Sequence, residues 1–552
     1  MTDRNQNTQM RNGGQILVSA LRAQGADRIF GVPGESALPV FDALKDANDI
    51  QFVTCRHEAN ASHMAEADGK ITGKPGICLV SRGPGAMHAA IGLHTAMQDS
   101  TPMLLLIGQV PRDHRGREAF QEIDYTRVFA SMAKWATEIH DAAAIPEAIA
   151  RAYQTATQGR PGPVVLCFPE DVLDQEVVAE DPPRYRIATP APTAEAMAEL
   201  RALLAKAERP VVIAGGDNWS ADARAHLEQF VRSNDLPFVA GFRSQAILDN
   251  RSPQYVGDLS LGCNPAVVKR VKDADLLLVI GDRLGDVTTQ HYTLLDIPRT
   301  KQTLIHVYPS AEELGRVYHP DLPIVATNAA FAAALAQQPV LDRARWADWR
   351  ANARKTYEAY RSPAKSSLDV DMAEVIVQLR ETIADNAVVT NGAGNYTIWL
   401  HRFFEYREFG TQLAPRSGSM GYGLPAAIAA KLRHPDRQVI ALAGDGCFQM
   451  ASPDFATAVQ QKLGIVVIIA NNETYGSIRM HQERQFPGRP NGTALTNPDF
   501  AELAKTYGAH GETVMRGAEF VPALKRALAA EGPAIIELRL DPNQLTPAMR
   551  VP

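Results

Sequence analysis

Short apolar runs alternate with longer, alanine-rich segments of helical periodicity along nearly the whole chain. In the first third, five such runs are expected to form strands: residues 28–32, 50–55, 77–81, 103–107 and 164–168. Strands of a parallel sheet are covered on both faces, so they read as continuous apolar runs, and helices connect them. The pattern therefore predicts α/β domains built on parallel sheets.

Two breaks divide this pattern into three parts. Residues 180–193 are rich in proline and lack periodicity, which is typical of a linker. Apolar runs resume at 210–214, 236–240, 275–280 and 303–307, a charged stretch follows at 340–365, and the last runs are 387–390, 438–443, 465–470 and 534–538. With about 150 residues per domain, the pattern predicts three doubly wound parallel-sheet domains, at 11–180, 194–345 and 366–540.

Composition narrows the class of protein without naming a function. The chain is 45% hydrophobic and 21% charged with a net charge of −6, which is ordinary for a globular protein and does not indicate a nucleic-acid partner. Its five cysteines form no CxxC pair, so reduced thiols are expected. The polar N-terminus lacks an apolar signal core, and no apolar segment approaches the roughly 18 residues of a membrane helix. We expect a cytoplasmic protein that does not enter a membrane.

The most specific chemical signal follows two strands of the third part. GDGC, residues 444–447, comes directly after one strand, and Asn471 and Asn472 come after the next. Because ligands bind at the carboxyl ends of parallel strands, Asp445 and Asn472 are expected to face one crevice. Their oxygens suit Mg²⁺, and the backbone after Asp445 suits a diphosphate. Either motif alone is also typical of a helix cap or a turn, but together they favour a ligand site.

With this spacing, GDG and NN resemble the thiamine-diphosphate-binding motif, and the resemblance covers almost the whole chain. Further segments follow in the order of the acetolactate synthase branch of thiamine-diphosphate enzymes: GVPGESALPVF, HEANASHMAEADGKITGKPG, GPGAMHAAIGLHTA, GREAFQEID, GSMGYGLPAAIAAK and NNETYG. The resemblance implies a lyase or transferase that decarboxylates a 2-oxo acid and transfers the product to a carbonyl acceptor.

The resemblance also implies which residues hold thiamine diphosphate and Mg²⁺. Asp445 and Asn472 would bind the metal through their side chains, and Thr474 through its carbonyl. Gly418 and Met420 would seat the aminopyrimidine, and GAGNY, residues 392–396, would touch the diphosphate, although its tyrosine is equally consistent with a core position. The implied cofactor residues are Gly394, Asn395, Tyr396, Gly418, Met420, Gly444, Gly446, Cys447, Thr474, Tyr475 and Gly476.

Glu58 matches the family's catalytic glutamate, which exchanges a proton with the aminopyrimidine ring and so activates the cofactor. A carboxyl group covered by a cofactor keeps its proton more readily than one in water, which suits that exchange. In the family, this glutamate and the diphosphate site belong to different subunits. The resemblance therefore implies a homodimer or homotetramer with its active site at the subunit interface.

A zinc site is the competing interpretation of the same segment. His57, His63 and Glu66 lie close to Glu58 in the sequence. The two histidines are six positions apart, which puts them on opposite faces of a helix, unlike the spacing in HExxH. Structural histidines are therefore favoured over metal ligands.

Residues near the reacting carbon depart from the acetolactate synthases. The resemblance places Phe120 and Gln121 beside the substrate as in those enzymes, whereas Glu35 stands where they have a small residue and decarboxylases have an aspartate. His481 replaces a tryptophan, and Glu170 replaces a lysine. Two outcomes stay open: a carboligase, or a non-ligating decarboxylase in which Glu35 donates a proton. The alternative interpretation of Glu35 is an exposed loop carboxylate without a role in the reaction.

Three further segments keep two interpretations each. The central part resembles the domain that holds FAD in the synthases, and GDRLGD at 281–286 follows a strand, so FAD binding and a flavin-dependent oxidase stay open. The polar stretch 479–492 is either a contact for a polar substrate or a solvated loop. The C-terminal segment 541–552 is either a lid over the site or a frayed end.

Overall fold

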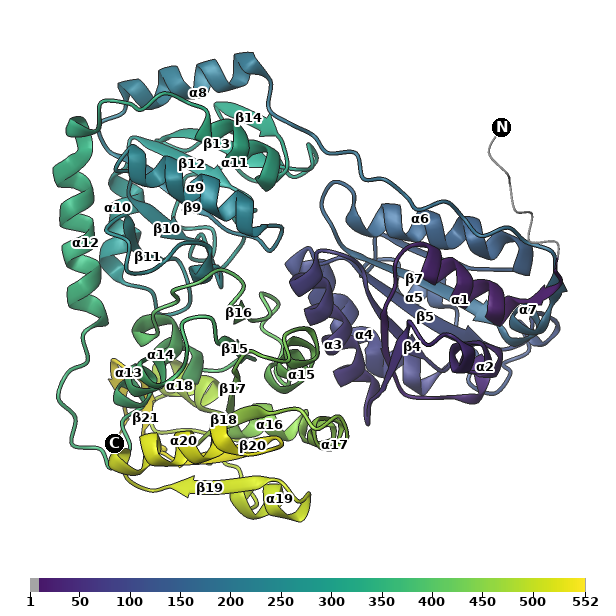
Figure 1. The fold of residues 1–552 in the computed structure, drawn as a ribbon. Helices are drawn as coiled ribbons and strands as arrows, with labels where there is room; N and C mark the ends of the chain where they lie inside the picture. The colour runs from purple at the N-terminus through teal and green to yellow at the C-terminus, as the bar shows by residue number, and fades with distance from the viewer. Residues whose placement is uncertain (1–8, 552) are drawn as a thin grey trace. The chain divides into compact units, whose positions relative to one another are not determined.

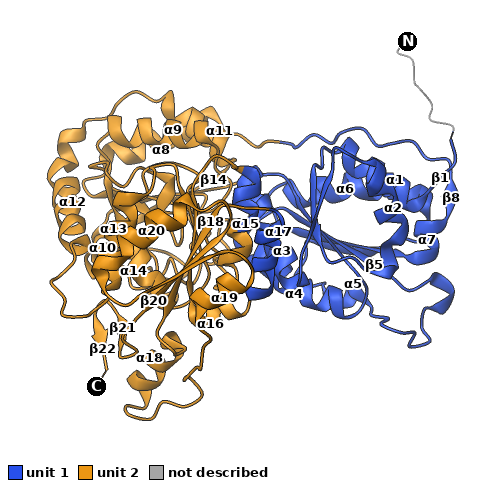
Figure 2. Cartoon of the chain, turned by 60° about the horizontal axis from the view of Figure 1, so that its bottom comes forward, with its two compact units in different colours: residues 1–188, 428–433, 451–461 blue, residues 189–427, 434–450, 462–552 orange. Residues whose placement is uncertain are grey.

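The computed structural model describes residues 9–551 and contains three six-stranded sheets, all of them parallel. The described chain forms two compact units: one holds residues up to 188 together with 428–433 and 451–461, and the other holds the rest (Figure 2). Each sheet is flanked by helices, so the predicted class of doubly wound parallel-sheet domains is confirmed. Residues 180–193, the predicted linker, form no helix or strand.

The N-terminal sheet has the strand order β3-β2-β4-β5-β7-β6. Its strands are β2 (Arg28–Gly31), β3 (Gln51–Thr54), β4 (Gly76–Val80), β5 (Met103–Gln109), β6 (Trp135–Glu138) and β7 (Pro163–Pro169). The helices α1 (Gly13–Ala23), α2 (Leu38–Asp46), α3 (Glu58–Thr72), α4 (Pro84–Asp99) and α6 (Ile145–Thr157) connect or flank them (Figure 1). The loops that leave β2, β3, β4 and β5 carry every residue that the sequence predicts to be catalytic in this domain.

Helix α3 is buried along most of its length, from residue 60 to residue 69. Within the same compact unit, Asp454 accepts hydrogen bonds from the backbone of Arg56, at 2.8 Å, and from Nδ2 of Asn60, at 2.7 Å. Burial raises the pKa of Asp454. These bonds hold the turn that precedes Glu58 and fix where α3 begins.

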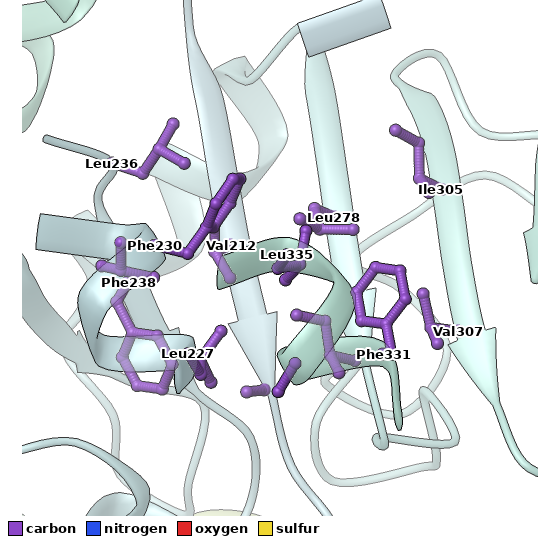
Figure 3. Packing of buried hydrophobic residues seen from close by; sticks show 14 of the residues in the cluster. Val212, Leu227, Phe230, Leu236, Phe238, Leu278, Ile305, Val307, Phe331 and Leu335 are labelled. Atoms are coloured by element: carbon purple, nitrogen blue, oxygen red, sulfur yellow. The ribbon is translucent and has the colours of Figure 1, made fainter. Parts of the chain in front are cut away.

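The central sheet has the strand order β11-β10-β9-β12-β13-β14. All its strands are parallel, but the chain adds β10 and β11 on one side of β9 and then β12, β13 and β14 on the other. Its strands are β9 (Pro210–Ala214), β10 (Phe238–Ala240), β11 (Tyr255–Asp258), β12 (Leu276–Ile280), β13 (Thr303–Tyr308) and β14 (Leu322–Val325). Helices α9 (Ala221–Ser233) and α11 (Asn328–Ala336) pack their apolar side chains on one face of this sheet, where Phe331 meets Val307 and Leu278 (Figure 3).

The C-terminal sheet has the strand order β16-β15-β17-β18-β20-β19. Its strands are β15 (Val388–Asn391), β16 (Gln412–Leu413), β17 (Val439–Gly444), β18 (Ile465–Asn471), β19 (His510–Val514) and β20 (Ala534–Arg539). Helices α14 (Tyr396–Phe403), α16 (Asp445–Gln449) and α18 (Gly476–Gln485) begin at or just beyond the carboxyl ends of β15, β17 and β18. A short hairpin, β21 (Gln544–Thr546) and β22 (Met549–Arg550), ends the described chain.

Among residues 9–551, no helix is long and apolar enough to cross a membrane.

Candidate cofactor site

A cavity of about 490 Å³ opens at the carboxyl ends of the C-terminal strands. It is lined by the loops that follow β15, β17 and β18 and by the segment before α15 (Gly423–Arg433). The structure brings together here all the cofactor and metal residues predicted in this domain: Gly394, Asn395, Tyr396, Gly418, Met420, Gly444, Asp445, Gly446, Cys447, Asn472, Thr474, Tyr475 and Gly476.

Asp445 is a buried carboxylate that forms no ion pair with a lysine, arginine or histidine among the described residues. Its Oδ1 accepts from the backbone of Gly446 at 2.8 Å, and its Oδ2 accepts from Nδ2 of Asn497 at 2.8 Å. Burial raises the pKa of Asp445 because the charged form loses its contact with water. A bound cation would restore the favourable environment for the charge, so this donor set fits Mg²⁺.

Asn472 and Thr474, just after β18, offer further oxygen atoms at the same cavity. Oδ1 of Asn472 accepts from the backbone of Thr474 at 3.4 Å, and Oγ1 of Thr474 donates to the carbonyl of Thr493 at 3.0 Å. The Thr474 carbonyl accepts from the backbone of Gly476 at 2.8 Å, which leaves one of its two lone pairs for a metal.

The glycines of the site keep the backbone close to neighbouring side chains. A Cβ on Gly444 would lie 3.1 Å from the ring of Tyr396, and a Cβ on Gly446 would lie 2.5 Å from the ring of Tyr475. The Tyr396 hydroxyl accepts from the backbone of Gly392 at 3.0 Å and lies 3.5 Å from Sγ of Cys447. Tyr396 is thus both buried and part of the cavity wall, so a core position and a position beside the cofactor are compatible for this residue.

The C-terminal hairpin forms part of the cavity wall. Nδ2 of Asn395 donates to the carbonyl of Leu545 at 2.8 Å, and Leu545 packs with Met480 and Val551 in a small apolar cluster. Asp541, Gln544, Leu545 and Pro547 of this segment line the cavity, and the lid interpretation remains a prediction. The far wall comes from the segment before α13 (Met372–Thr382) and from α14, with Lys365, Ser366, Trp399 and Arg402. No motif had indicated these four residues.

In the N-terminal unit, one short segment, residues 81–88, contacts most of the predicted catalytic residues. A Cβ on Gly85 would lie 3.3 Å from Oε1 of Glu58, and Nδ1 of His88 lies 2.9 Å from Oε2 of Glu58. A Cβ on Gly83 would lie 2.6 Å from Cβ of Gln121. Glu58 and Gln121 therefore lie along the same edge of the sheet.

Arg82 connects two acidic residues, Glu35 and Glu170, for which the motif resemblance predicts a departure from the synthases. Its Nη2 donates to Oε1 of Glu35 at 2.8 Å, and its Nη1 forms an ion pair with Glu170. The guanidinium is nearly buried, whereas the Glu35 side chain is 67% exposed. Glu35 is therefore a surface carboxylate anchored at one end by a buried cation. Phe120, from the loop after β5, is 76% exposed and points to a surface that this unit leaves uncovered.

His57, Glu58 and His88 lie close enough together to hold a metal ion by distance alone. The two imidazole rings are stacked, with centroids 4.5 Å apart and planes at 29°. Nδ1 of His57 accepts from the backbone of Ala59 at 3.1 Å and caps α3. Glu66 instead accepts from Thr101 and pairs with Lys70 at 3.0 Å. The geometry favours the structural interpretation of these histidines.

His481 does not join the other predicted residues. It lies on α18 with an exposed side chain and is absent from the cavity wall. On the same helix, Arg479 donates to the carbonyl of Pro542 and to Asn543, both at 3.1 Å, and so holds the C-terminal segment. A role for His481 in substrate selection remains a prediction.

Three site residues carried no usable sequence signal. Asn497 lies 52 positions beyond Asp445, His88 lies 30 positions beyond Glu58, and Arg82 lies 47 positions beyond Glu35. Only the folded sheets bring these pairs within hydrogen-bond distance.

The chain matches three domains described for thiamine pyrophosphate enzymes, in the order of that family. The N-terminal TPP binding domain matches residues 11–128, the central domain matches residues 197–335, and the C-terminal TPP binding domain matches residues 392–538.

Similar proteins cover nearly the full length of the chain. The probable acetolactate synthase large subunit of Methanocaldococcus jannaschii is 31% identical over 97% of this chain and 93% of its own length. The acetolactate synthase isozyme 2 large subunit of Escherichia coli K12 is 30% identical over 96% of each. The acetolactate synthase of Bacillus subtilis is 29% identical over 96% of this chain and 93% of its own length. The chain belongs to the thiamine pyrophosphate enzymes. Within that family it is acetolactate synthase-like, which confirms the resemblance read from its motifs.

Proposed function

We propose that this protein is a thiamine-diphosphate- and Mg²⁺-dependent carboligase that decarboxylates a pyruvate-like 2-oxo acid and joins the acyl unit to a carbonyl acceptor. One observation carries the proposal: every residue that the resemblance assigns to the cofactor and metal in the C-terminal domain lines a single cavity. The names of the relatives support pyruvate as the donor.

Each group has a defined task in this proposal. Asp445, Asn472 and the Thr474 carbonyl hold Mg²⁺, which neutralises the diphosphate. Thiamine diphosphate, when bound, supplies the electron sink for decarboxylation. Glu58 exchanges a proton with the aminopyrimidine ring, and His88, bonded to its Oε2, holds that carboxyl in place.

A second copy of the chain is the proposed partner. Met87 and Ile91 lie one turn apart on α4 and are 43% and 39% exposed, and Phe120 is more exposed still. Apolar side chains on a surface that also carries Glu58 suit a subunit interface. We therefore infer a homodimer or homotetramer, working in the cytoplasm.

The contact between Glu35 and Arg82 favours ligation over simple decarboxylation. Oε1 of Glu35 is held as a hydrogen-bond acceptor by the nearly buried guanidinium of Arg82, while the rest of the Glu35 side chain is exposed. In this arrangement Glu35 is better suited to accept a hydrogen bond from a hydroxyl or amino group of the substrate than to act as an acid.

The central domain does not fit a flavin pyrophosphate. Dinucleotides bind where the strand order reverses, beyond β9 and β12. There, a Cβ on Gly215 would lie 2.2 Å from Oδ2 of Asp282, and a Cβ on Gly241 would lie 2.1 Å from the same atom. The Asp282 carboxylate occupies this crevice and would repel a pyrophosphate, so we do not assign FAD to this domain.

The test is activity on pyruvate after both cofactors have been removed by dialysis and restored one at a time. We expect turnover only when thiamine diphosphate and Mg²⁺ are both present, and a colourless protein. Turnover that needs a flavin or an electron acceptor would instead support the oxidase alternative.

A further inference from the structure

Arg243 is a buried arginine of the central domain that reaches the cofactor loops of the C-terminal domain. It follows β10, is 4% exposed and lies in the same compact unit as the cavity. Its backbone has φ +54°, a left-handed conformation that residues other than glycine rarely adopt. Such strain persists only where the surrounding contacts hold it in place.

The guanidinium of Arg243 donates to two main-chain carbonyls. Nη2 donates to the carbonyl of Gly392 at 2.9 Å, and Nη1 donates to the carbonyl of Pro415. Gly392 begins the segment that contains Gly394 and Asn395, whereas Pro415 begins the segment that contains Gly418 and Met420. One side chain therefore ties the two loops proposed to hold opposite ends of the cofactor.

Arg416 makes the reverse connection. From the second loop, its Nε donates to the carbonyl of Phe242 at 3.0 Å, and its Nη2 donates to the Arg243 carbonyl at 3.2 Å and to Oγ of Ser244 at 2.9 Å. Its Nη1 forms an ion pair with Asp217, in the loop after β9. The two arginines thus cross between the domains in opposite directions.

We propose that Arg243 and Arg416 form a clasp through which the central domain positions the cofactor loops. This inference rests on the proposed cofactor site and gives the central domain a task that needs no nucleotide. Both arginines are positioning residues, since they hold the backbone of the loops rather than the reacting atoms. Four hydrogen bonds to main-chain carbonyls, one to Oγ of Ser244 and an ion pair with the Asp217 side chain are directional contacts, and they fix the geometry of the loops more tightly than apolar packing does.

The decisive variant is Arg243→Lys, which keeps the charge but replaces the planar fork, whose two nitrogens each bond one carbonyl, by a single ammonium nitrogen on a flexible chain. Arg354→Lys is its matched control. Nη1 of Arg354 donates to the carbonyls of Asn250, Ser252 and Tyr255 within the central domain, and Arg354 does not line the cavity. Arg416→Lys tests the other half of the clasp and keeps the proposal testable if Arg243→Lys does not fold.

Two measurements on the full-length protein separate positioning from a general loss of stability. Hydrogen–deuterium exchange of the cofactor-free protein should be faster at residues 392–396 and 415–421 in Arg243→Lys and Arg416→Lys, and unchanged there in Arg354→Lys. Titration calorimetry with thiamine diphosphate and Mg²⁺ should show affinity lowered by roughly 10-fold or more in the two clasp variants only. Excess cofactor should restore kcat.

Unchanged exchange at both loops, or equal cofactor affinity in Arg243→Lys and Arg354→Lys, would overturn the clasp. A failure of the proposed function would look different. In that case the wild-type protein would not bind thiamine diphosphate, or Asp445→Asn would bind it as tightly as the wild type does.

Discussion

Nη2 of Arg82 donates to Oε1 of Glu35 across the ends of two neighbouring strands, at 2.8 Å. The same guanidinium pairs with Glu170, so one nearly buried cation serves two carboxylates. The motif resemblance implies other residues at both glutamate positions in the synthases, so this cluster is where a difference from those enzymes can be tested.

Substitution of Glu35 should separate the two candidate outcomes. Because Oε1 of Glu35 accepts from Arg82 and the side chain is otherwise exposed, we expect Glu35→Gln to raise KM for the acceptor while the ratio of ligated product to free aldehyde stays within about 3-fold. Product ratios are measured by gas chromatography with pyruvate and an added aldehyde. Glu170→Gln, which shares Arg82 but is less exposed, is the matched control. Loss of free aldehyde with ligation retained would instead assign Glu35 as a proton donor.

Glu58 should be needed for turnover but not for cofactor binding. Removal of a general acid–base group typically lowers rates by about 10²–10⁴-fold, so Glu58→Gln should lower kcat by that amount while thiamine diphosphate still binds. Stopped-flow kinetics and calorimetry on one preparation give both values. His88→Asn should lower kcat less than Glu58→Gln does. Equal activity of wild type and Glu58→Gln would show that the catalytic glutamate is elsewhere.

The oxygen cluster around Asp445 should control Mg²⁺ affinity. Groups that orient a metal ligand are typically worth about 10–100-fold in affinity. We therefore expect Asn497→Ala to weaken Mg²⁺-supported cofactor binding by that factor, and Asp445→Asn to weaken it more. Asp436→Asn, at an exposed position in the same domain, is the control and should bind normally. Calorimetry at several Mg²⁺ concentrations checks the order, and tight binding by Asp445→Asn contradicts the metal assignment.

Two buried histidines should make the fold sensitive to mild acid. Burial lowers the pKa of His63 to about 3, and burial with the nearby charge of Arg243 lowers the pKa of His401 to about 3. Below pH 6.5 the unfolded chain takes up a proton at each site while the folded chain does not, so stability falls as pH decreases. At pH 5.5 the loss is roughly 1 kcal/mol per histidine.

The slope of Tm between pH 8 and pH 5.5 tests this effect. His401→Gln should lower that slope relative to the wild type, whatever its Tm at pH 8. The exposed His319, changed to Gln, should leave the slope unaltered. A wild-type slope in His401→Gln would mean that this imidazole titrates normally in the folded protein.

The buried strands of the three sheets were predictable because their apolar runs are continuous. Residues 210–214 match β9 at both ends, and 465–470 differs from β18 by one residue. Two edge strands, β6 and β14, were missed for the opposite reason. β6 reads WATE and is only half buried, while β14 contains Pro323 and alternates buried with exposed positions. An edge strand with one covered face carries too weak an apolar signal to separate it from a loop.

The sequence pattern also did not predict that two segments of the third domain belong to the compact unit of the N-terminal domain. Residues 428–433 and 451–461 follow the periodicity of the third domain, yet they belong to the compact N-terminal unit. There, Arg433 pairs with Asp27 at 2.7 Å and with Asp68 at 2.5 Å. Local periodicity reports which face of an element is covered, not which distant element covers it.

The residues of the site that belong to motifs were predictable, whereas the residues that hold the cofactor loops in place were not. Asp445 and Asn472 follow strands with a spacing that resembles a family motif, so their shared cavity could be expected. Arg243 and Pro415 are 172 positions apart, and neither belongs to a motif. Their contact depends on how the central and C-terminal sheets pack.

The most direct test of the proposed function uses pyruvate labelled with ¹³C at its carbonyl carbon. The protein is incubated with thiamine diphosphate and Mg²⁺, with and without an acceptor aldehyde, and the products are followed by ¹³C NMR. We expect a ligated hydroxyketone product that contains a new carbon–carbon bond to the labelled atom, and no such product from Glu58→Gln. Release of labelled acetaldehyde alone, or no consumption of any 2-oxo acid, would contradict a carboligase.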